Sequence, residues 1–309
     1  MAVSETKELE EVAISVIIPT TCEAARWGSL QRAIRSLRDQ RGVCVEVLVV
    51  VNGTRFDQTG YEQLRSMKGL RVLYREQGGL PGALRFGRTQ VTTPYFAFLD
   101  DDDEYMPGAL WHRSRPLAVD EGVDYVVSNG YRSDGESEQL VLESIGRIRR
   151  DPLRALIAGN WLASCGGLFR SASVSIDFFD GTTSFLEWTL LAYKLASCRR
   201  GGFIDVATFR IHESPTSLSK SEAYKHAEVD VLRKILDLDL PDDVRRALRM
   251  KSGRANHRLS NHHLRAGNLG RAWRYHIASL FGPGGAGYLA YSRKLLPFWP
   301  KERERRPPV

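Results

Sequence analysis

The chain has 309 residues, of which 42% are hydrophobic, so it can bury one large core or two modest ones. Its 44 lysines and arginines exceed its 37 aspartates and glutamates, and the formal net charge of +7 favours anionic partners such as nucleotides, nucleic acid or acidic lipid. The four cysteines show neither CxxC spacing nor a His/Cys cluster, which argues against a zinc site or a disulfide framework. No apolar signal segment opens the chain and no apolar run reaches the ~18 residues of a spanning helix, so we expect a cytoplasmic protein.

The first hundred residues alternate strand and helix patterns. Short runs rich in β-branched residues predict buried strands, and apolar residues spaced three or four apart predict helices. The predicted strands cover residues 14–18, 43–51, 70–74 and 95–99, and the predicted helices cover 30–37 and 83–89. Strands separated by helices in this way are typical of α/β folds with a parallel sheet.

The rest of the chain is mixed and then helical. It shows strand patterns at residues 123–128 and 203–211, an extended segment at 163–170, and helix patterns at 152–157 and 185–195. From about residue 221 the patterns are mainly helical, with breaks at Pro241, Gly267, Gly270 and residues 282–285. We therefore expect an α/β domain over residues 1–220 and a helical C-terminal extension over 221–309, ending in a charged, disordered tail.

Four aspartates, residues 100–103, stand directly after a predicted strand. Adjacent carboxylates raise one another's pKa unless positive charge lies among them. Mg²⁺ and Mn²⁺ take hard oxygen ligands, commonly carboxylates together with substrate phosphates. Asn52 also follows a strand, and ligands of open α/β sheets bind beyond the carboxyl ends of the strands. The aspartates are consistent with a metal site lining such a crevice, or with a solvated acidic turn.

Six segments, taken in order, resemble glycosyltransferase family 2. They are ISVIIPT (14–20), VLVVVNGT (47–54), GGLPGALRFG (78–87), YFAFLDDDDEYMPGAL (95–110), NWLASCGGLFR (160–170) and RIHESPTS (210–217). The resemblance covers roughly residues 12–220 and implies a GT-A fold, a Rossmann-like, mostly parallel central sheet flanked by helices. It also implies an inverting, nucleotide-sugar-dependent glycosyltransferase that modifies a glycan or lipid-linked acceptor in surface polysaccharide synthesis.

The same resemblance implies roles for the acidic run and for a late histidine. Asp102 is the implied main ligand of Mn²⁺ or Mg²⁺, Asp100 touches the ribose or the metal, and Asp101 belongs with the donor-binding residues. His212, in the Arg-x-His segment, is implied as a further ligand of the metal or a contact to phosphate, whereas Asp103 orients the loop. A cation there would neutralise the charge that develops on the departing nucleoside diphosphate.

A carboxylate near the acceptor hydroxyl is needed as general base in an inverting transfer. Relatives carry Glu-Asp at the start of a helix, and alignment on Trp188 puts Leu186 and Glu187 in those places. The resemblance therefore implies Glu187 as the base, one methylene longer than the aspartate of relatives. Asp180 is the rival, and a surface glutamate at a helix N-terminus is the alternative.

Donor recognition is expected at the ends of the first two strands. Relatives often carry Asp-Asp-Gly-Ser where this chain has Val51-Asn52-Gly53-Thr54. The Asn52 amide both donates and accepts, which suits uracil or thymine and favours a pyrimidine nucleotide, although an ordinary Asn-Gly turn is the alternative. Further expected donor-binding residues are Pro19, Thr20, Thr21, Glu23, Gly79 and Arg85; Arg85 is equally compatible with a solvated helix position.

The C-terminal residues combine basic and aromatic side chains. We expect residues 255–281 to pack as a helical hairpin, and the basic end, residues 293–309, to contact the anionic inner face of the membrane peripherally. No nucleic-acid-binding motif is recognised. Two alternatives stay open: a sugar-nucleotide nucleotidyltransferase, and a catalytically inactive relative that binds partners, which the substitutions at Val51, Leu84 and Leu186 would fit.

Overall fold

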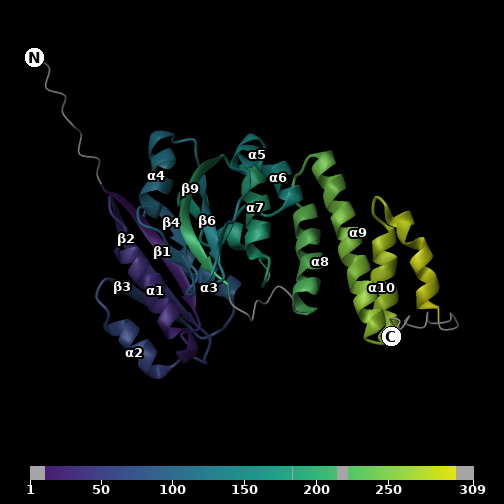
Figure 1. Ribbon diagram of the computed structural model, residues 1–309, viewed down its shortest axis with the longest axis horizontal. Coiled ribbons are helices and arrows are strands. Elements are labelled where there is room, and N and C mark those ends of the chain that lie inside the picture. The colour runs from purple at the N-terminus through teal and green to yellow at the C-terminus, as the bar shows by residue number, and fades with distance from the viewer. Residues whose placement is uncertain (1–10, 183, 214–221, 297–309) are drawn as a thin grey trace, which may run out of the picture. The chain divides into compact units, whose positions relative to one another are not determined.

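The computed structural model describes residues 11–182, 184–213 and 222–296, and the chain divides into two compact units, Met1–Ser217 and Leu218–Val309. Figure 1 traces the chain from the purple N-terminal end to the yellow C-terminal end. The strands of the first unit are β1 Val12–Thr20, β2 Val43–Asn52, β3 Leu70–Arg75, β4 Tyr95–Phe98, β5 Glu104–Tyr105, β6 Tyr125–Ser133, β7 Glu138–Leu140, β8 Gly167–Arg170 and β9 Gly201–His212. Its helices, with η marking 3₁₀ turns, are η1 Ala24–Arg26, α1 Trp27–Arg38, α2 Gln58–Ser66, α3 Leu80–Thr89, α4 Ala109–Val119, α5 Ile145–Arg150, α6 Pro152–Ala158, η2 Ile176–Phe179 and α7 Glu187–Cys198.

The strands form one mixed sheet in the order β3-β2-β1-β4-β8-β6-β9-β5, with β7 paired to β6. Strands β3, β2, β1 and β4 are mutually parallel, as predicted for the first hundred residues. The second half differs, because β8 runs antiparallel to both β4 and β6, and β5 runs antiparallel to β9. The α/β class and the GT-A type of sheet are thus confirmed, with an antiparallel part that the alternating pattern did not predict.

Helices cover both faces of the parallel strands. On one face, Ile14, Val16 and Ile18 of β1 are buried in the same core as the apolar stripe of α1, which includes Leu30 and Ile34. This stripe has the three- and four-residue spacing of a helix with one apolar side. Helix α3 packs against β1 and β2 on the opposite face.

Three neighbouring parallel strands end together at one edge of the sheet. Strand β1 ends at Thr20, β2 ends at Asn52, and β4 ends at Phe98, two residues before the first aspartate. Because β1 lies between β2 and β4, the segments that follow these strands must be close to one another. The fold therefore brings Thr20, Asn52 and the acidic run to the same place.

The second unit is helical, with α8 Glu222–Leu236, α9 Asp242–Arg265, α10 Leu269–Leu280 and η4 Gly285–Leu295. Helices α9 and α10 lie side by side (Figure 1) and turn through Gly267, which has a φ of 75°, so the predicted hairpin is confirmed. Ser260 Oγ donates a hydrogen bond of 2.8 Å to the carbonyl of Ala272 across this hairpin. Within the described part of the chain, every helix is too short or too polar to cross a bilayer. The predicted disordered tail, residues 301–309, lies outside the described residues.

Candidate active site

The acidic run forms a tight loop between β4 and β5. Asp100, Asp102 and Asp103 each offer a carboxylate oxygen, and these oxygens lie within 4.8 Å of one another. The loop is closed by a hydrogen bond of 3.1 Å from the Asp103 N–H to the Asp100 carbonyl. Clustered hard oxygen ligands are what Mg²⁺ and Mn²⁺ prefer, so the residues present fit the implied metal.

Within the cluster, the environment of Asp100 disfavours its ionised form. Burial, together with the charges of Asp102, Asp101 and Glu187, raises the pKa of Asp100 to about 7. A hydrogen bond from Ser164 acts in the opposite direction but does not cancel these effects. A divalent cation would favour the ionised form of these carboxyls.

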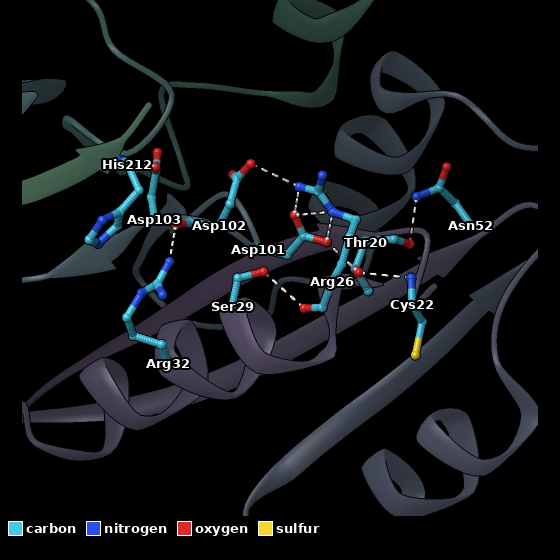
Figure 2. Close-up of polar contacts among 10 residues, drawn as sticks. All are labelled: Thr20, Cys22, Arg26, Ser29, Arg32, Asn52, Asp101, Asp102, Asp103 and His212. Carbon is cyan, nitrogen blue, oxygen red and sulfur yellow. Dashed lines mark hydrogen bonds and ion pairs between the residues drawn. The ribbon is translucent and has the colours of Figure 1, made fainter. Parts of the chain in front are cut away.

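Asp103 is buried, and the end of β9 holds it. Burial and the charge of Asp100 raise the pKa of Asp103 well above its usual value. The His212 backbone N–H donates to its Oδ1 at 3.2 Å, and Cys165 Sγ donates to its Oδ2 at 3.5 Å. The His212 imidazole points away from Asp102 (Figure 2), with Nε2 3.4 Å from Glu104 Oε1. The contact of His212 with the loop thus runs through its backbone, and ligation of a metal by its ring stays a prediction.

Asp101 is turned toward the β1–α1 connection instead. Its Oδ2 accepts a hydrogen bond of 2.5 Å from Thr20 Oγ1, and both of its oxygens accept from Arg26 Nε, at 3.0 and 2.9 Å. Arg26 Nη2 contacts both Asp101 and, at 3.0 Å, Asp102 Oδ2 (Figure 2). Arg32 Nη2 donates to the Asp102 carbonyl at 2.7 Å. Sequence reasoning missed both arginines, because their partners are 75 and 70 residues away along the chain.

The Asn52 amide ties three segments together at the same edge of the sheet. Its Nδ2 donates to the Thr20 carbonyl at 2.9 Å, and its Oδ1 accepts from the Gly79 N–H at 2.9 Å. Gly79 has a φ of 121°, a conformation that favours glycine. Both ends of the amide are engaged within the chain, and its expected recognition of a pyrimidine base stays a prediction.

The remaining expected donor-binding residues flank these contacts. Pro19 lies within β1 opposite Val50, and Thr21 follows the strand. Glu23 immediately precedes η1, and its carboxylate lies 3.5 Å from Arg55 Nη2, an ion pair at the surface. The structure therefore places Pro19, Thr21 and Glu23 near the strand ends, and their contact with a donor stays a prediction.

Glu187 begins α7, and its side chain is buried. Burial raises the pKa of this carboxyl, although the backbone N–H groups of Glu187 and Phe185 donate to it. Among the described residues Oε2 has no hydrogen-bond partner. Glu187 lies close enough to Asp100 for its charge to raise the pKa of that residue. The structure thus brings the expected base and the acidic loop together.

Asp180 and Arg85, two other candidates, contact each other. Arg85 Nε donates to Asp180 Oδ1 at 2.6 Å, and each side chain is about half exposed, at 51% and 50%. The rival base is therefore a paired carboxylate at the surface, whereas Glu187 is buried and its Oε2 meets no hydrogen-bond partner in the part of the chain that the structure describes. Contact of Arg85 with donor phosphates stays a prediction.

Comparison with known proteins agrees with this fold. The sequence pattern described as Glycosyl transferase family 2 matches residues 15–176. A glycosyltransferase of Rickettsia conorii, described as uncharacterized, is 30% identical over 120 residues, which are 38% of this chain and 19% of that protein. A counterpart from Rickettsia prowazekii is 31% identical over 118 residues, 38% of this chain and 36% of that one. The match thus spans well under half of each relative.

Solved structures of S. aureus TarS have a similar fold. The crystal structure of TarS 1-349 in complex with UDP-GlcNAc has a TM-score of 0.61 at 16% identity, covering 92% of this chain and 85% of that one. The complex of the same protein with UDP has a TM-score of 0.54 and covers 87% and 91%. At this identity the likeness concerns the fold alone. The family pattern covers more than half of the chain, and this chain belongs to glycosyl transferase family 2.

Proposed function

We propose that this protein is an inverting, divalent-metal-dependent glycosyltransferase. In this proposal it moves a sugar from a nucleoside diphosphate donor to a hydroxyl of a glycan or lipid-linked acceptor, in the synthesis of a surface polysaccharide. The observation that carries the proposal is the placement of three carboxylates within 4.8 Å of one another beside the buried Glu187, at the carboxyl edge of a parallel sheet. The acceptor class rests on the family resemblance.

The acidic loop would hold the metal. Asp102, with Asp100 and Asp103, supplies the carboxylate oxygens, and the backbone of His212 fixes Asp103 in place. When bound, Mn²⁺ or Mg²⁺ supplies positive charge to the departing diphosphate. Fixed charge of this kind lowers the barrier because it stabilises the transition state more than the ground state.

Glu187 would accept the proton of the acceptor hydroxyl. A general base works best when its pKa lies near the operating pH, and burial raises the pKa of Glu187 in that direction. Its Oε2, which lacks a partner among the described residues, is available to accept a hydrogen bond from the hydroxyl. The nearby acidic loop would place this base beside the sugar attached to the diphosphate.

A uridine nucleotide is the proposed donor. The fold resembles that of TarS, which has been crystallised with UDP and with UDP-GlcNAc. The ends of β1 and β2, where Thr20 and Asn52 lie, are the part of the sheet edge available to the base and ribose. The identity of the sugar is left to the experiment below.

Peripheral membrane contact through the basic C-terminal end, residues 293–309, is also proposed, although residues 297–309 lie outside the described residues. Leu289 and Leu296 are 58% and 48% exposed, and Phe281 is 86% exposed, on segments that also carry the exposed Arg293 and Lys294. Exposed apolar and basic side chains together favour the surface of an anionic bilayer. Flotation with vesicles containing anionic lipid tests this part, and failure to float at low salt contradicts it without affecting the proposed enzyme activity.

Ligand-dependent stability tests the donor and the metal together. We expect UDP with Mn²⁺ to raise the melting temperature more than either alone, since a ligand at 100 times its Kd contributes about 2.7 kcal/mol. Nucleotide sugars with other bases serve as comparisons, and the best donor is then used in a transfer assay. Asp102→Ala should abolish the effect of Mn²⁺ yet fold normally, because its carboxyl is 39% exposed. Full activity of this variant, or of the wild type in excess chelator, contradicts metal dependence.

A further inference from the structure

The four carboxylates of the acidic loop separate into Asp101, which is buried against a guanidinium, and the three that cluster within 4.8 Å of one another. Asp101 has a side chain only 4% exposed, and the Arg26 guanidinium lies against both of its oxygens. Thr20 Oγ1 donates to the same carboxylate. With these partners Asp101 is satisfied inside the protein, and it is not one of the three carboxylates that cluster within 4.8 Å.

Arg26 also reaches into the cluster. Its Nη2 lies 3.0 Å from Oδ2 of Asp102, a carboxylate that belongs to the proposed metal set. The two side chains are each 39% exposed, so this second contact is far less buried than the contact with Asp101. The guanidinium is therefore firmly anchored on one aspartate and weakly attached to the next.

Arg26 carries its charge at every relevant pH. Hydrogen bonding to Asp101 raises its pKa still further, despite the opposing effect of burial. A divalent cation that used Asp102 would meet a carboxylate already paired with the Arg26 guanidinium and would be repelled by that guanidinium. Binding of the metal and the Arg26–Asp102 contact therefore compete for the same carboxylate.

We infer that Arg26 is a built-in competitor of the metal: anchored on Asp101, it neutralises Asp102 until a divalent cation displaces that contact. Arg26 is on this account a positioning residue, and the inference rests on the metal site of the proposed function. This arrangement explains why the loop carries Asp101, the aspartate outside the cluster of three. Asp101 would keep the guanidinium of Arg26 beside the site after the metal displaces it from Asp102. The protein avoids an uncompensated cluster of carboxylates in its metal-free form at the expense of weaker metal binding.

A charge-neutral double variant provides the test. Arg26→Met with Asp101→Asn removes one positive and one negative charge, so the long-range field at the site is preserved while the competitor is lost. The amide oxygen introduced by Asp101→Asn would still accept the hydrogen bond from Thr20, and no buried carboxylate is left unpaired. We expect the Kd for Mn²⁺, measured without donor on the full chain from the electron paramagnetic resonance signal of free Mn²⁺, to fall roughly three- to tenfold.

The control makes the same two substitutions at a more exposed Arg–Asp ion pair elsewhere in the unit. Arg200 directly precedes β9, and Asp120 lies in the segment before β6; their side chains form an ion pair with an N–O distance of 2.8 Å. This pair lies at the amino ends of the two strands, at the opposite end of the sheet from the acidic loop. Arg200→Met with Asp120→Asn should leave the Kd within about twofold of wild type. Arg26→Lys keeps the charge but lacks the planar fork, so its Kd should lie between those of wild type and the double variant.

Each outcome decides the inference. The inference is overturned if the folded Arg26/Asp101 double variant has a Kd for Mn²⁺ equal to or above that of wild type. If the double variant does not fold, Arg26→Lys decides instead, and a Kd for Mn²⁺ at or above that of wild type overturns the inference. In both cases Mn²⁺ binding by wild type leaves the proposed metal site standing. If wild type binds no Mn²⁺ even with UDP, the metal site itself is refuted, and the inference with it.

Discussion

Asp180 accepts a hydrogen bond of 2.6 Å from Arg85, so a carboxylate that could have been the catalytic base is paired with a cation at the surface. The other candidate, Glu187, is buried near the acidic loop, and no described residue donates a hydrogen bond to its Oε2. A base needs a free lone pair close to the reacting hydroxyl. The two residues therefore differ in whether the carboxylate is paired with a cation or available to accept a proton.

This difference leads to a prediction for turnover. Glu187→Gln keeps the size of the side chain but cannot accept a proton, so kcat for sugar transfer should fall by about 10² to 10⁴. The Kd for the nucleotide donor should change little, because the group acts on the acceptor. Asp180→Asn is the matched control and should change kcat by only a few-fold. The reverse ranking of the two variants would assign the role of base to Asp180.

The raised pKa of Glu187 also predicts how its effect on stability varies with pH. A carboxyl with a higher pKa in the folded state binds a proton more tightly there, so its contribution to the free energy of unfolding is fully present at low pH. That contribution is lost as the pH rises through the folded-state pKa. Glu187→Gln stays neutral, so between about pH 5 and pH 8 the variant should become more stable relative to wild type, by on the order of 1 kcal/mol.

Urea denaturation of wild type and Glu187→Gln across this range measures the effect, which includes the influence of the Glu187 charge on the pKa of Asp100. Glu62→Gln, on the exposed surface of α2, is the control and should follow wild type at all pH values. Parallel curves for wild type and Glu187→Gln would show that burial of this carboxyl has no energetic consequence.

The Asn52 amide predicts a stability effect that does not depend on ligand. Asn52→Asp replaces the N–H donor to the Thr20 carbonyl by a carboxylate oxygen, leaving two acceptors facing each other in a buried position. We expect the free energy of unfolding to fall by about 1–3 kcal/mol in urea denaturation without nucleotide. Gln58→Glu makes the same chemical change on an exposed helix and should cost at most about 0.5 kcal/mol. An unchanged stability of Asn52→Asp would mean that these bonds do not hold the strand ends together.

Two helical glycines give a matched pair for the packing of the sheet. A Cβ at Gly87 of α3 would lie 2.5 Å from Ile17 Cγ2, whereas a Cβ at Gly28 of α1 would meet nothing within 4 Å. Gly87→Ala should therefore destabilise the fold by about 1–3 kcal/mol through overpacking. Gly28→Ala should stabilise it by about 0.5–1 kcal/mol, since alanine loses less backbone entropy in a helix. Thermal denaturation of both variants checks the sign, and a stabilised Gly87→Ala would show that α3 can move away from β1.

Sequence patterns predicted the parallel strands well because β1, β2 and β4 contain short, buried apolar runs, and the edge strand β3 still carries alternating apolar residues. They could not predict that residues 167–170 would run antiparallel, since strand direction depends on partners far along the chain. The predicted extended segment, residues 163–170, contains this strand but says nothing of its neighbours. The hydrophobic pattern of a strand thus predicts where the strand lies in the sequence, but not its neighbours or its direction in the sheet.

The site shows the same limit. The aspartate run was recognisable because its four charges are consecutive, and Glu187 because alignment on Trp188 sets it against the catalytic aspartate of relatives. No local sequence pattern distinguishes Arg26. It lies in a connection between a strand and a helix, and its role depends on an aspartate 75 residues later in the chain. A chain with many arginines offers no way to choose this one before the fold brings it to the loop.

The bond from the His212 N–H to Asp103 has a consequence for synthesis of the protein, because its partners are 109 residues apart. At the usual rate of about 5–20 residues per second, a ribosome needs roughly 5–20 s to make that stretch. During this interval the nascent chain already contains the whole acidic loop and lacks the strand that holds it. The earliest β-strands can pair while translation continues, but the loop acquires its final shape only after β9 has emerged.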